Sequence, residues 1–336
     1  MDTNVEPVLS VPTNIITGFL GVGKTTAILH LLKSKPESER WAVLVNEFGE
    51  IGVDGSLIQG QHAEGCGVFI REVPGGCMCC AAGLPMHIAL NQLLSRAKPH
   101  RLLIEPTGLG HPKEVLEVLS ADHYRGVLDI QKCVTLIDAR KLHDSRYTNH
   151  DTFNQQIDIA DVVVGNKQEL YQQADKALLK DYIQRRSGAS PRIYFASYGK
   201  IDAVILQGAS ASARVLPTQA HRPDHHHERL DINTAPIPAC GYLQVENSGE
   251  GFRSLGWRFS PEKVFNRDAL FTLLSGLRAE RMKAVFITQE GVFGYNLTPD
   301  ALTEFELDDC LESRIEIIAS EDEPLSQLQL LQCLTD

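Results

Sequence analysis

A chain of 336 residues is long enough to bury a full core and to hold two domains. Its formal net charge of −11 argues against a nucleic-acid partner, because binding to a phosphate backbone depends on clustered Lys and Arg. No apolar run approaches the length of a membrane span, and residues 1–11 show neither a basic nor an apolar leader, so we expect a cytoplasmic protein without a membrane partner. Because that compartment is reducing, the eight cysteines are interpreted as thiols and metal ligands rather than disulfides.

The first predicted element is a strand at residues 14–17, followed by a glycine-rich segment and a helical pattern. The residues that satisfy the phosphate-loop pattern G-x-x-x-x-G-K-[ST] are Gly18, Gly23, Lys24 and Thr25. Glycines let backbone N–H groups approach phosphates, and a helix N-terminus adds partial positive charge. We expect Lys24 to reach the β- and γ-phosphates and the Thr25 hydroxyl to hold Mg²⁺. Gly21 and Thr26 complete this predicted site, and a glycine-rich turn without a ligand would explain neither Lys24 nor Thr25.

Strand-like apolar runs alternate with helical patterns after this loop, which predicts an α/β fold with a mostly parallel sheet covered on both faces. The further strands are predicted at residues 42–45, 102–104, 134–137, 162–164 and 193–195. The helices are predicted at residues 86–94, 115–119 and 177–183, after a first helix whose apolar face holds Ile28, Leu29 and Leu32. A nucleotide then sits beyond the carboxyl ends of the strands.

Three cysteines fall within four residues behind Gly75 and Gly76, namely Cys77, Cys79 and Cys80. Zinc favours thiolate and imidazole ligands in tetrahedral geometry. In an extended segment Cys77 and Cys79 point to one side and Cys80 to the other, so the first two can share one ion. A further ligand must come from elsewhere, and His111 or His123 would supply an imidazole. The alternative is a cluster of buried thiols.

The remaining cysteines are scattered, and we predict that they are core residues rather than ligands: Cys66, Cys133, Cys240, Cys310 and Cys333.

Two later segments fit a nucleotide site. Glu105 ends an apolar strand and would orient the water shell of Mg²⁺, while the backbone N–H of Gly108 would meet a γ-phosphate. Asn166, Lys167 and Glu169 follow another apolar strand and resemble the guanine-reading N-K-x-D element of GTPases. The acidic side chain would accept hydrogen bonds from guanine that adenine does not offer. Glu169 stands where that element has Asp, and a solvated strand-to-helix loop is the alternative.

The composition shifts to Ala, Ser, Pro and His over residues 208–239, which we interpret as a linker. Its histidines, His221 and His225 to His227, would capture metal weakly, or the linker is solvated and without function. Residues 240–336 read as a small α+β domain. Its predicted strands are residues 242–246, 257–260 and 314–318, with a hairpin at 284–288 and 292–296 and helices at 268–277 and 324–334. Residues 1–207 form the predicted P-loop domain.

These motifs together resemble the CobW-type metallochaperone GTPases. The matching segments are residues 18–25, Asn46-Glu47-Phe48-Gly49-Glu50, Gly75-Gly76-Cys77-Met78-Cys79-Cys80 and Glu105-Pro106-Thr107-Gly108. The resemblance extends over nearly the whole chain and implies a CobW-like C-terminal domain. It implies slow, metal-linked hydrolysis of GTP to GDP and phosphate, and delivery of zinc to a client metalloprotein. It also makes Glu47 our first choice for a further zinc ligand, because the matching glutamate of the family lies near the cysteines.

We therefore expect switch segments at residues 47–54 and 105–111 to flank the cysteine loop, so that nucleotide state changes metal affinity. Two other functions stay open: a zinc buffer or scaffold without catalysis, and a P-loop kinase of a small metabolite, against which Asn166 and Lys167 argue. The sequence leaves open the client, the choice among zinc, cobalt and nickel, the water-orienting residue and the oligomeric state, a homo-oligomer included.

Overall fold

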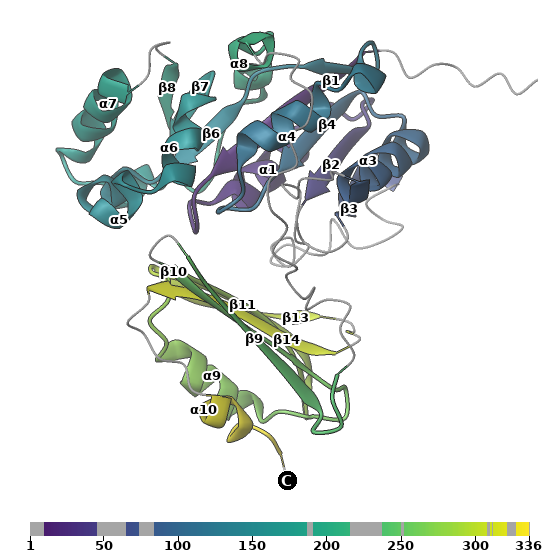
Figure 1. Cartoon of the computed structure of the whole chain (residues 1–336), viewed down its shortest axis with the longest axis vertical. Helices are drawn as coiled ribbons and strands as arrows, with labels where there is room; N and C mark the ends of the chain where they lie inside the picture. Colours follow the sequence, from purple (N-terminus) through teal and green to yellow (C-terminus); the bar gives the residue numbers. More distant parts are fainter. Residues whose placement is uncertain are drawn as a thin grey trace, which may run out of the picture. The chain divides into compact units, whose positions relative to one another are not determined.

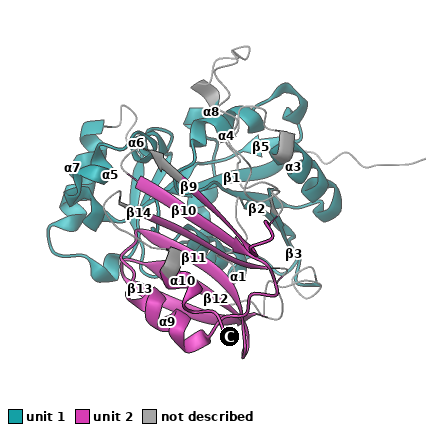
Figure 2. Cartoon of the chain, turned by 60° about the horizontal axis from the view of Figure 1, so that its bottom comes forward, with its two compact units in different colours: residues 1–48, 55–226 teal, residues 49–54, 227–336 magenta. Residues whose placement is uncertain are grey.

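The computed structural model describes residues 10–45, 65–73, 84–186, 191–215, 237–249, 252–307, 310, 312–320 and 327–335. The chain divides into two compact units, which Figure 2 distinguishes by colour. The described residues up to 215 belong to the first unit, and those from 237 on belong to the second. No helix in these ranges is long and apolar enough to cross a membrane.

The first unit is built on an eight-stranded sheet in which every paired strand runs parallel to its neighbour (Figure 1). The strand order is β3-β2-β4-β1-β6-β7-β8, and β5 also pairs with β1. The strands are β1 (Val11–Gly18), β2 (Trp41–Val45), β3 (Val68–Glu72), β4 (Arg101–Glu105), β5 (Leu128–Ile130), β6 (Val134–Ile137), β7 (Val162–Gly165) and β8 (Arg192–Phe195). β1 lies at the centre, so the loop that follows it starts from the middle of the sheet.

Helices of the first unit alternate with its strands. They are α1 (Lys24–Lys33), α3 (Leu84–Ala97), α4 (Pro112–Leu119), α5 (Ser145–Thr148), α6 (Asp151–Asp158), α7 (Asp175–Arg186) and α8 (Ala211–Val215). Short 3₁₀ turns are η2 (Asp122–Tyr124), η3 (Ala139–His143), η4 (Gln168–Leu170) and η5 (Ala203–Leu206). Ile15 and Ile16 of β1 are both fully buried, and their side chains point to opposite faces, so the sheet is covered on both sides.

The second unit is a six-stranded antiparallel sheet with the order β13-β12-β11-β14-β10-β9. Its elements are β9 (Tyr242–Gly249), β10 (Phe252–Phe259), α9 (Arg267–Ser275), β11 (Arg281–Thr288), β12 (Gly291–Thr298), β13 (Ala301–Leu307), β14 (Ser313–Ser320) and α10 (Gln327–Leu331). Large side chains of one sheet face, such as Trp257 and Phe286, form a core with Leu270, Leu274 and Leu330 of the two helices. The expected α/β domain with a smaller α+β domain is therefore confirmed.

Several local expectations differ from the structure. The buried face of α1 holds Ile28, Leu31 and Leu32, an i, i+3, i+4 set, whereas Leu29 is only partly buried. The closing helix was expected at 324–334. In the structure α10 covers Gln327–Leu331, and residues 324–326 lie outside the described residues.

The first residues of the expected linker, 208–213, contact the first unit. Ser210 is 1% exposed, and the N–H of Gly208 donates a 2.7 Å hydrogen bond to Oε1 of Gln131. The N–H of Ala211, at the start of α8, donates at 2.8 Å to Oδ1 of Asp161. These contacts attach residues 208–213 to the sheet, although their small and polar composition resembles that of a linker. His221 and His225 to His227 lie outside the described residues.

Candidate functional site

The predicted phosphate loop connects β1 to α1. Lys24 and Thr25 are the first residues of α1 and are 5% and 6% exposed. The N-cap residue of α1 is Gly23, which has no side chain to cap the helix, and the first turn contains no acidic residue. The N–H groups there therefore keep their partial positive charge, which favours an anion. The local structure meets the requirements of a phosphate site, and the binding roles of Gly18, Gly21, Gly23 and Thr26 remain proposals.

Glu105 reaches the start of α1 because β4 lies beside β1 in the sheet. The Thr25 hydroxyl donates a 2.9 Å hydrogen bond to Oε1 of Glu105, and both residues are buried. Nζ of Lys24 donates at 3.3 Å to the carbonyl of Phe19 within the loop. Hydroxyl and carboxylate oxygens suit Mg²⁺, and neighbouring ligands in an octahedral shell with bonds of about 2.1 Å lie about 3 Å apart. The Thr25–Glu105 pair thus fits a magnesium site.

Asn166, at the end of β7, holds the phosphate loop and a second loop together. Its Nδ2 donates to the carbonyl of Val22 at 2.9 Å, and its Oδ1 accepts from the N–H of Gly199 at 3.1 Å. The side chain is 2% exposed, so both bonds are shielded from water. Asn166 therefore fixes the position of the loop after β8 relative to α1.

The segment after Asn166 is partly exposed at Lys167 and Gln168 and exposed at Glu169. Lys167 has a φ of 59°, and Glu169 lies exposed on η4. The N–H of Gln168 donates at 3.0 Å to the carbonyl of Ala196, which ties this segment to the end of β8. The Glu169 carboxylate is exposed and therefore accessible to a ligand, and its guanine-reading role remains a proposal.

The turn that contains Gly199 was missing from the expected site. Gly199 has a φ of +68°, and a Cβ there would lie 2.8 Å from the backbone N of Ala27. Only glycine therefore permits this close approach to the first turn of α1. The sequence signal was a glycine four residues after the predicted strand at 193–195, which is too common to identify a site alone.

The segment from Gly108 to His111 leads from the end of β4 into α4. His111 immediately precedes Pro112, the first residue of α4. Nδ1 of His111 lies 3.2 Å from Oε1 of Gln155 in α6. An amide oxygen only accepts hydrogen bonds, so this contact is a hydrogen bond when the ring carries a proton on Nδ1. In the neutral form of that tautomer, Nε2 has the lone pair that a metal ion would bind.

His123, the other candidate imidazole, is placed in η2 and contacts α3. Its Nε2 lies 3.3 Å from Nδ1 of His87, which is also 3.0 Å from the Tyr124 hydroxyl. Burial, and then the neighbouring His123, lower the pKa of His87. The described residues contain no group of three or more His, Cys, Asp and Glu side chains suited to a metal ion. Glu47, Cys77, Cys79 and Cys80 lie outside the described residues.

The scattered cysteines differ in environment. Cys133 and Cys333 are buried as expected, and burial raises the pKa of both thiols, that of Cys133 to about 12. Cys66 and Cys240 are exposed and Cys310 is partly buried, so the expectation of core positions was wrong for the two exposed residues. Both lie just before a strand begins, where the chain turns at the surface.

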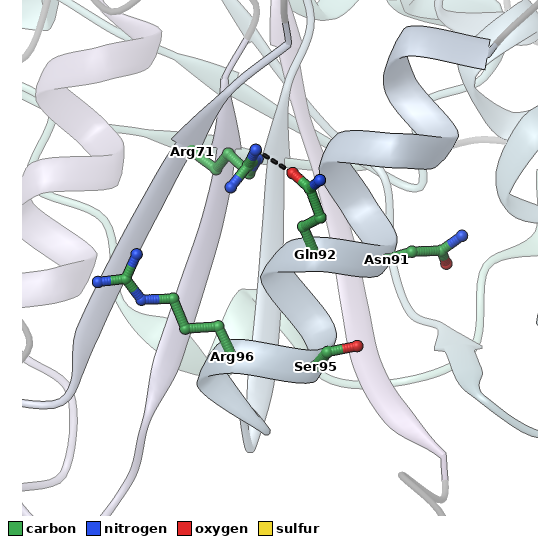
Figure 3. A pocket seen from close by; sticks show the side chains of 5 residues that line it. All are labelled: Arg71, Asn91, Gln92, Ser95 and Arg96. Atoms are coloured by element: carbon green, nitrogen blue, oxygen red, sulfur yellow. Dashed lines mark hydrogen bonds between the residues drawn. The ribbon is translucent and has the colours of Figure 1, made fainter.

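A shallow hollow lies between the edge strand β3 and α3 (Figure 3). The residues that line it all have polar or charged side chains, and they are Arg71, Asn91, Gln92, Ser95 and Arg96. Arg71 donates a hydrogen bond to Oε1 of Gln92 across it. None of these residues belongs to the expected nucleotide or metal set.

The sequence of the chain matches a known family and several known proteins. Residues 12–193 match the family described as CobW/HypB/UreG, nucleotide-binding domain. The chain is 38% identical over 320 residues to the zinc chaperone YeiR of Escherichia coli (strain K12), with 94% of this chain and 95% of that protein covered. It is 29% identical over 239 residues to the zinc chaperone CobW of Sinorhizobium sp, covering 64% and 67%. A crystal structure of Zn(II)-bound YjiA GTPase from E. coli is 18% identical, with 96% and 98% covered and a TM-score of 0.45.

Proposed function

We propose that this chain, which belongs to the CobW/HypB/UreG family of nucleotide-binding proteins, is a GTPase that couples its nucleotide state to the binding and transfer of zinc. The observation that carries the catalytic part is the buried Thr25–Glu105 hydrogen bond at the N-terminus of α1. The zinc part is supported by the cysteine cluster and by the relatives that are named zinc chaperones.

Catalysis by this chain would consist of positioning and electrostatics. The Thr25 hydroxyl would hold Mg²⁺ and Glu105 would orient its water shell, and this ion neutralises phosphate charge when it is bound with GTP. Lys24 would exchange its bond to the Phe19 carbonyl for the β- and γ-phosphates, and the N–H groups at the start of α1 would surround them. Neither an arginine finger nor a water-orienting glutamine is evident, so we propose slow intrinsic turnover.

Guanine selection would come from the loops after β7 and β8. Asn166 fixes both loops against the phosphate site, while Glu169 offers an exposed carboxylate. This carboxylate would accept two N–H groups of guanine, which adenine lacks in that arrangement. The same loops argue against a small-metabolite kinase, because a kinase does not require guanine recognition.

Zinc would be the cargo rather than a permanent cofactor. Cys77 and Cys79 are the proposed principal ligands, with Cys80, Glu47 and His111 as further candidates. The lone pair on Nε2 of His111 supports its inclusion, since its other ring nitrogen already donates to Gln155. A client metalloprotein would then receive the ion when the nucleotide state changes.

The test is GTP hydrolysis by metal-free protein titrated separately with zinc, cobalt and nickel. We expect zinc to change the turnover, and the comparison among the three ions identifies the metal that drives the enzyme. A zinc buffer or scaffold without catalysis would bind zinc with no metal-dependent turnover, and that result would contradict the proposal.

A further inference from the structure

We infer that Gln155 and Gln156 of α6 are positioning residues that link the nucleotide site to His111. Nε2 of Gln156 donates a 2.9 Å hydrogen bond to the carbonyl of Gly108, and Oε1 of Gln155 accepts from Nδ1 of His111 at 3.2 Å. The two glutamines thus hold both ends of one four-residue segment. The inference rests on the proposed function, because it assigns Gly108 to the γ-phosphate and His111 to zinc.

α6 is anchored firmly enough to serve as a fixed support. Gln156 is 1% exposed, and its carbonyl accepts a 2.6 Å hydrogen bond from the Thr135 hydroxyl of β6. Phe153 and Ile157 of the same helix are also buried. A movement of residues 108–111 would therefore occur against α6 rather than together with it.

Gly108 is confined on its other side by the phosphate loop. A Cβ at this position would lie 2.9 Å from Cδ2 and 3.0 Å from the backbone N of Leu20. The N–H of Gly108 lies in the 107–108 peptide bond. The carbonyl of Gly108, which accepts the hydrogen bond from Gln156, lies in the next peptide bond, 108–109. If that N–H donates to a γ-phosphate, the adjacent peptide bond must adjust between Leu20 and Gln156, and the adjustment reaches His111 three residues later.

The side-chain amide of Gln156 is only half satisfied in this state. Its Oε1 is buried and has no hydrogen-bond partner among the described residues. Leaving a buried acceptor unpaired is unfavourable, because the oxygen has lost its bonds to water without gaining a partner. A second arrangement of residues 108–111 that presents an N–H to this oxygen would recover that cost, which supplies the two-state element that coupling requires.

Gln155 acts on the metal side of the same segment. By accepting from Nδ1 it fixes the tautomer and the ring orientation of His111, as outer partners of metal-binding histidines do. A shift of the segment alters this contact, and with it the direction of the Nε2 lone pair. Simple structural support would lower stability when either glutamine is replaced, but it would leave the coupling between the two sites intact.

The experiment measures the affinity of the full chain for a fluorescent, non-hydrolysable GTP analogue, with zinc removed and with zinc saturating. The ratio of the two affinities is the coupling factor, typically about 5–150-fold in allosteric proteins. We expect Gln155→Met and Gln156→Met, which keep the side-chain length but cannot hydrogen-bond in the same way, to bring this ratio close to one. Gln155→Glu retains an acceptor for His111 and is expected to keep the wild-type ratio.

Asn154→Leu is the matched control on the same helix. Asn154 bonds to the Thr148 carbonyl and to the Tyr182 hydroxyl instead of the 108–111 segment, so its loss is expected to lower stability at an unchanged ratio. Gln155 is only partly buried, so its variant tests the inference even if Gln156→Met does not fold. Folded methionine variants that keep the wild-type ratio would overturn the inference. A wild-type ratio of one would instead contradict the proposed metal-coupled function.

Discussion

The hydroxyl of Thr25 donates a 2.9 Å hydrogen bond to Oε1 of Glu105, although 80 positions separate the two residues in the chain. The parallel pairing of β1 with β4 brings them together at the carboxyl edge of the sheet. Both side chains are buried, so the bond joins the first turn of α1 to the start of the segment that contains Gly108 and His111. This bond is the structural basis for assigning phosphate chemistry to one end of the sheet.

Replacing Lys24 with Ala should abolish GTP hydrolysis and leave zinc binding largely intact. Lys24 is the residue proposed to bind the β- and γ-phosphates, whereas the proposed zinc ligands lie in other segments. Phosphate release and zinc binding by the folded variant provide the two measurements. Lys33→Ala, at the exposed end of the same helix, is the control and should retain activity. An equal loss of metal binding in folded Lys24→Ala would contradict the separation of the two sites.

Glu169→Gln should weaken GTP binding much more than ATP binding. Hydrogen bonds to a charged group contribute about 1.5–3 kcal/mol, so we expect a loss of about tenfold or more for GTP. Displacement of a labelled nucleotide by GTP and by ATP measures both affinities. Glu117→Gln, on α4, controls for the change in charge. Wild-type protein that binds ATP as tightly as GTP would refute the role of Glu169.

Gly199→Ala should reduce both stability and nucleotide affinity. An added Cβ would lie 2.8 Å from the backbone N of Ala27, and the left-handed backbone adds about 1–2 kcal/mol of strain. Gly126→Ala is the matched control, because Gly126 has a φ of +78° but no atom within 4 Å of the added carbon. Denaturant unfolding should show the larger loss for Gly199→Ala, and only that variant should bind nucleotide more weakly. Equal effects of the two substitutions would remove the argument for the loop after β8.

Native protein treated with iodoacetamide at pH 8 should be modified at Cys66 and Cys240 well before Cys133. The thiols of Cys66 and Cys240 are exposed, whereas burial raises the pKa of the Cys133 thiol to about 12 and keeps it protonated. Peptide mass mapping over time measures the order of modification. Early labelling of Cys133 would show that its site opens readily.

The raised pKa of Cys133 also makes the free energy of unfolding fall as the pH rises above about 9. The thiol of the unfolded chain loses its proton there, whereas the thiol of the folded chain does not.

The alternation of apolar strands and helical patterns was sufficient to predict the central sheet, and the strands expected at 42–45 and 102–104 coincide with β2 and β4. β3, β5 and β13 were not predicted. β3 and β13 lie at sheet edges, where polar side chains such as Arg71 and Glu306 interrupt the apolar pattern, and β5 is only three residues long.

The phosphate-loop part of the candidate site could be predicted from the sequence, because its residues lie close together in the chain. The bridges made by Asn166 and by the two glutamines of α6 were not, since each depends on which loops the sheet brings together. Gln155 and Gln156 stand in a helix of polar composition, and nothing in that pattern indicates that Gln156 is buried. Long-range contacts of this kind appear only once the chain is folded.

Cys79→Ser should remove tight zinc binding, because a hydroxyl is a much poorer zinc ligand than a thiolate. The variant should retain the metal-free rate of GTP hydrolysis and lose any change that zinc makes to it. Competition with a chromogenic chelator measures the affinity. Undiminished tight binding by this variant would place the zinc site elsewhere.

The most direct test of the whole account is the zinc affinity of the wild-type chain, measured by chelator competition with and without a non-hydrolysable GTP analogue. Linkage requires that a nucleotide whose affinity depends on zinc must change zinc affinity by the same factor. The account predicts that the zinc affinity measured with the GTP analogue clearly differs from the affinity measured without it. In Lys24→Ala this difference should be absent when the analogue is kept at concentrations too low for the variant to bind it. Identical affinities in the two nucleotide conditions would leave a GTPase with a merely structural metal and would contradict the account.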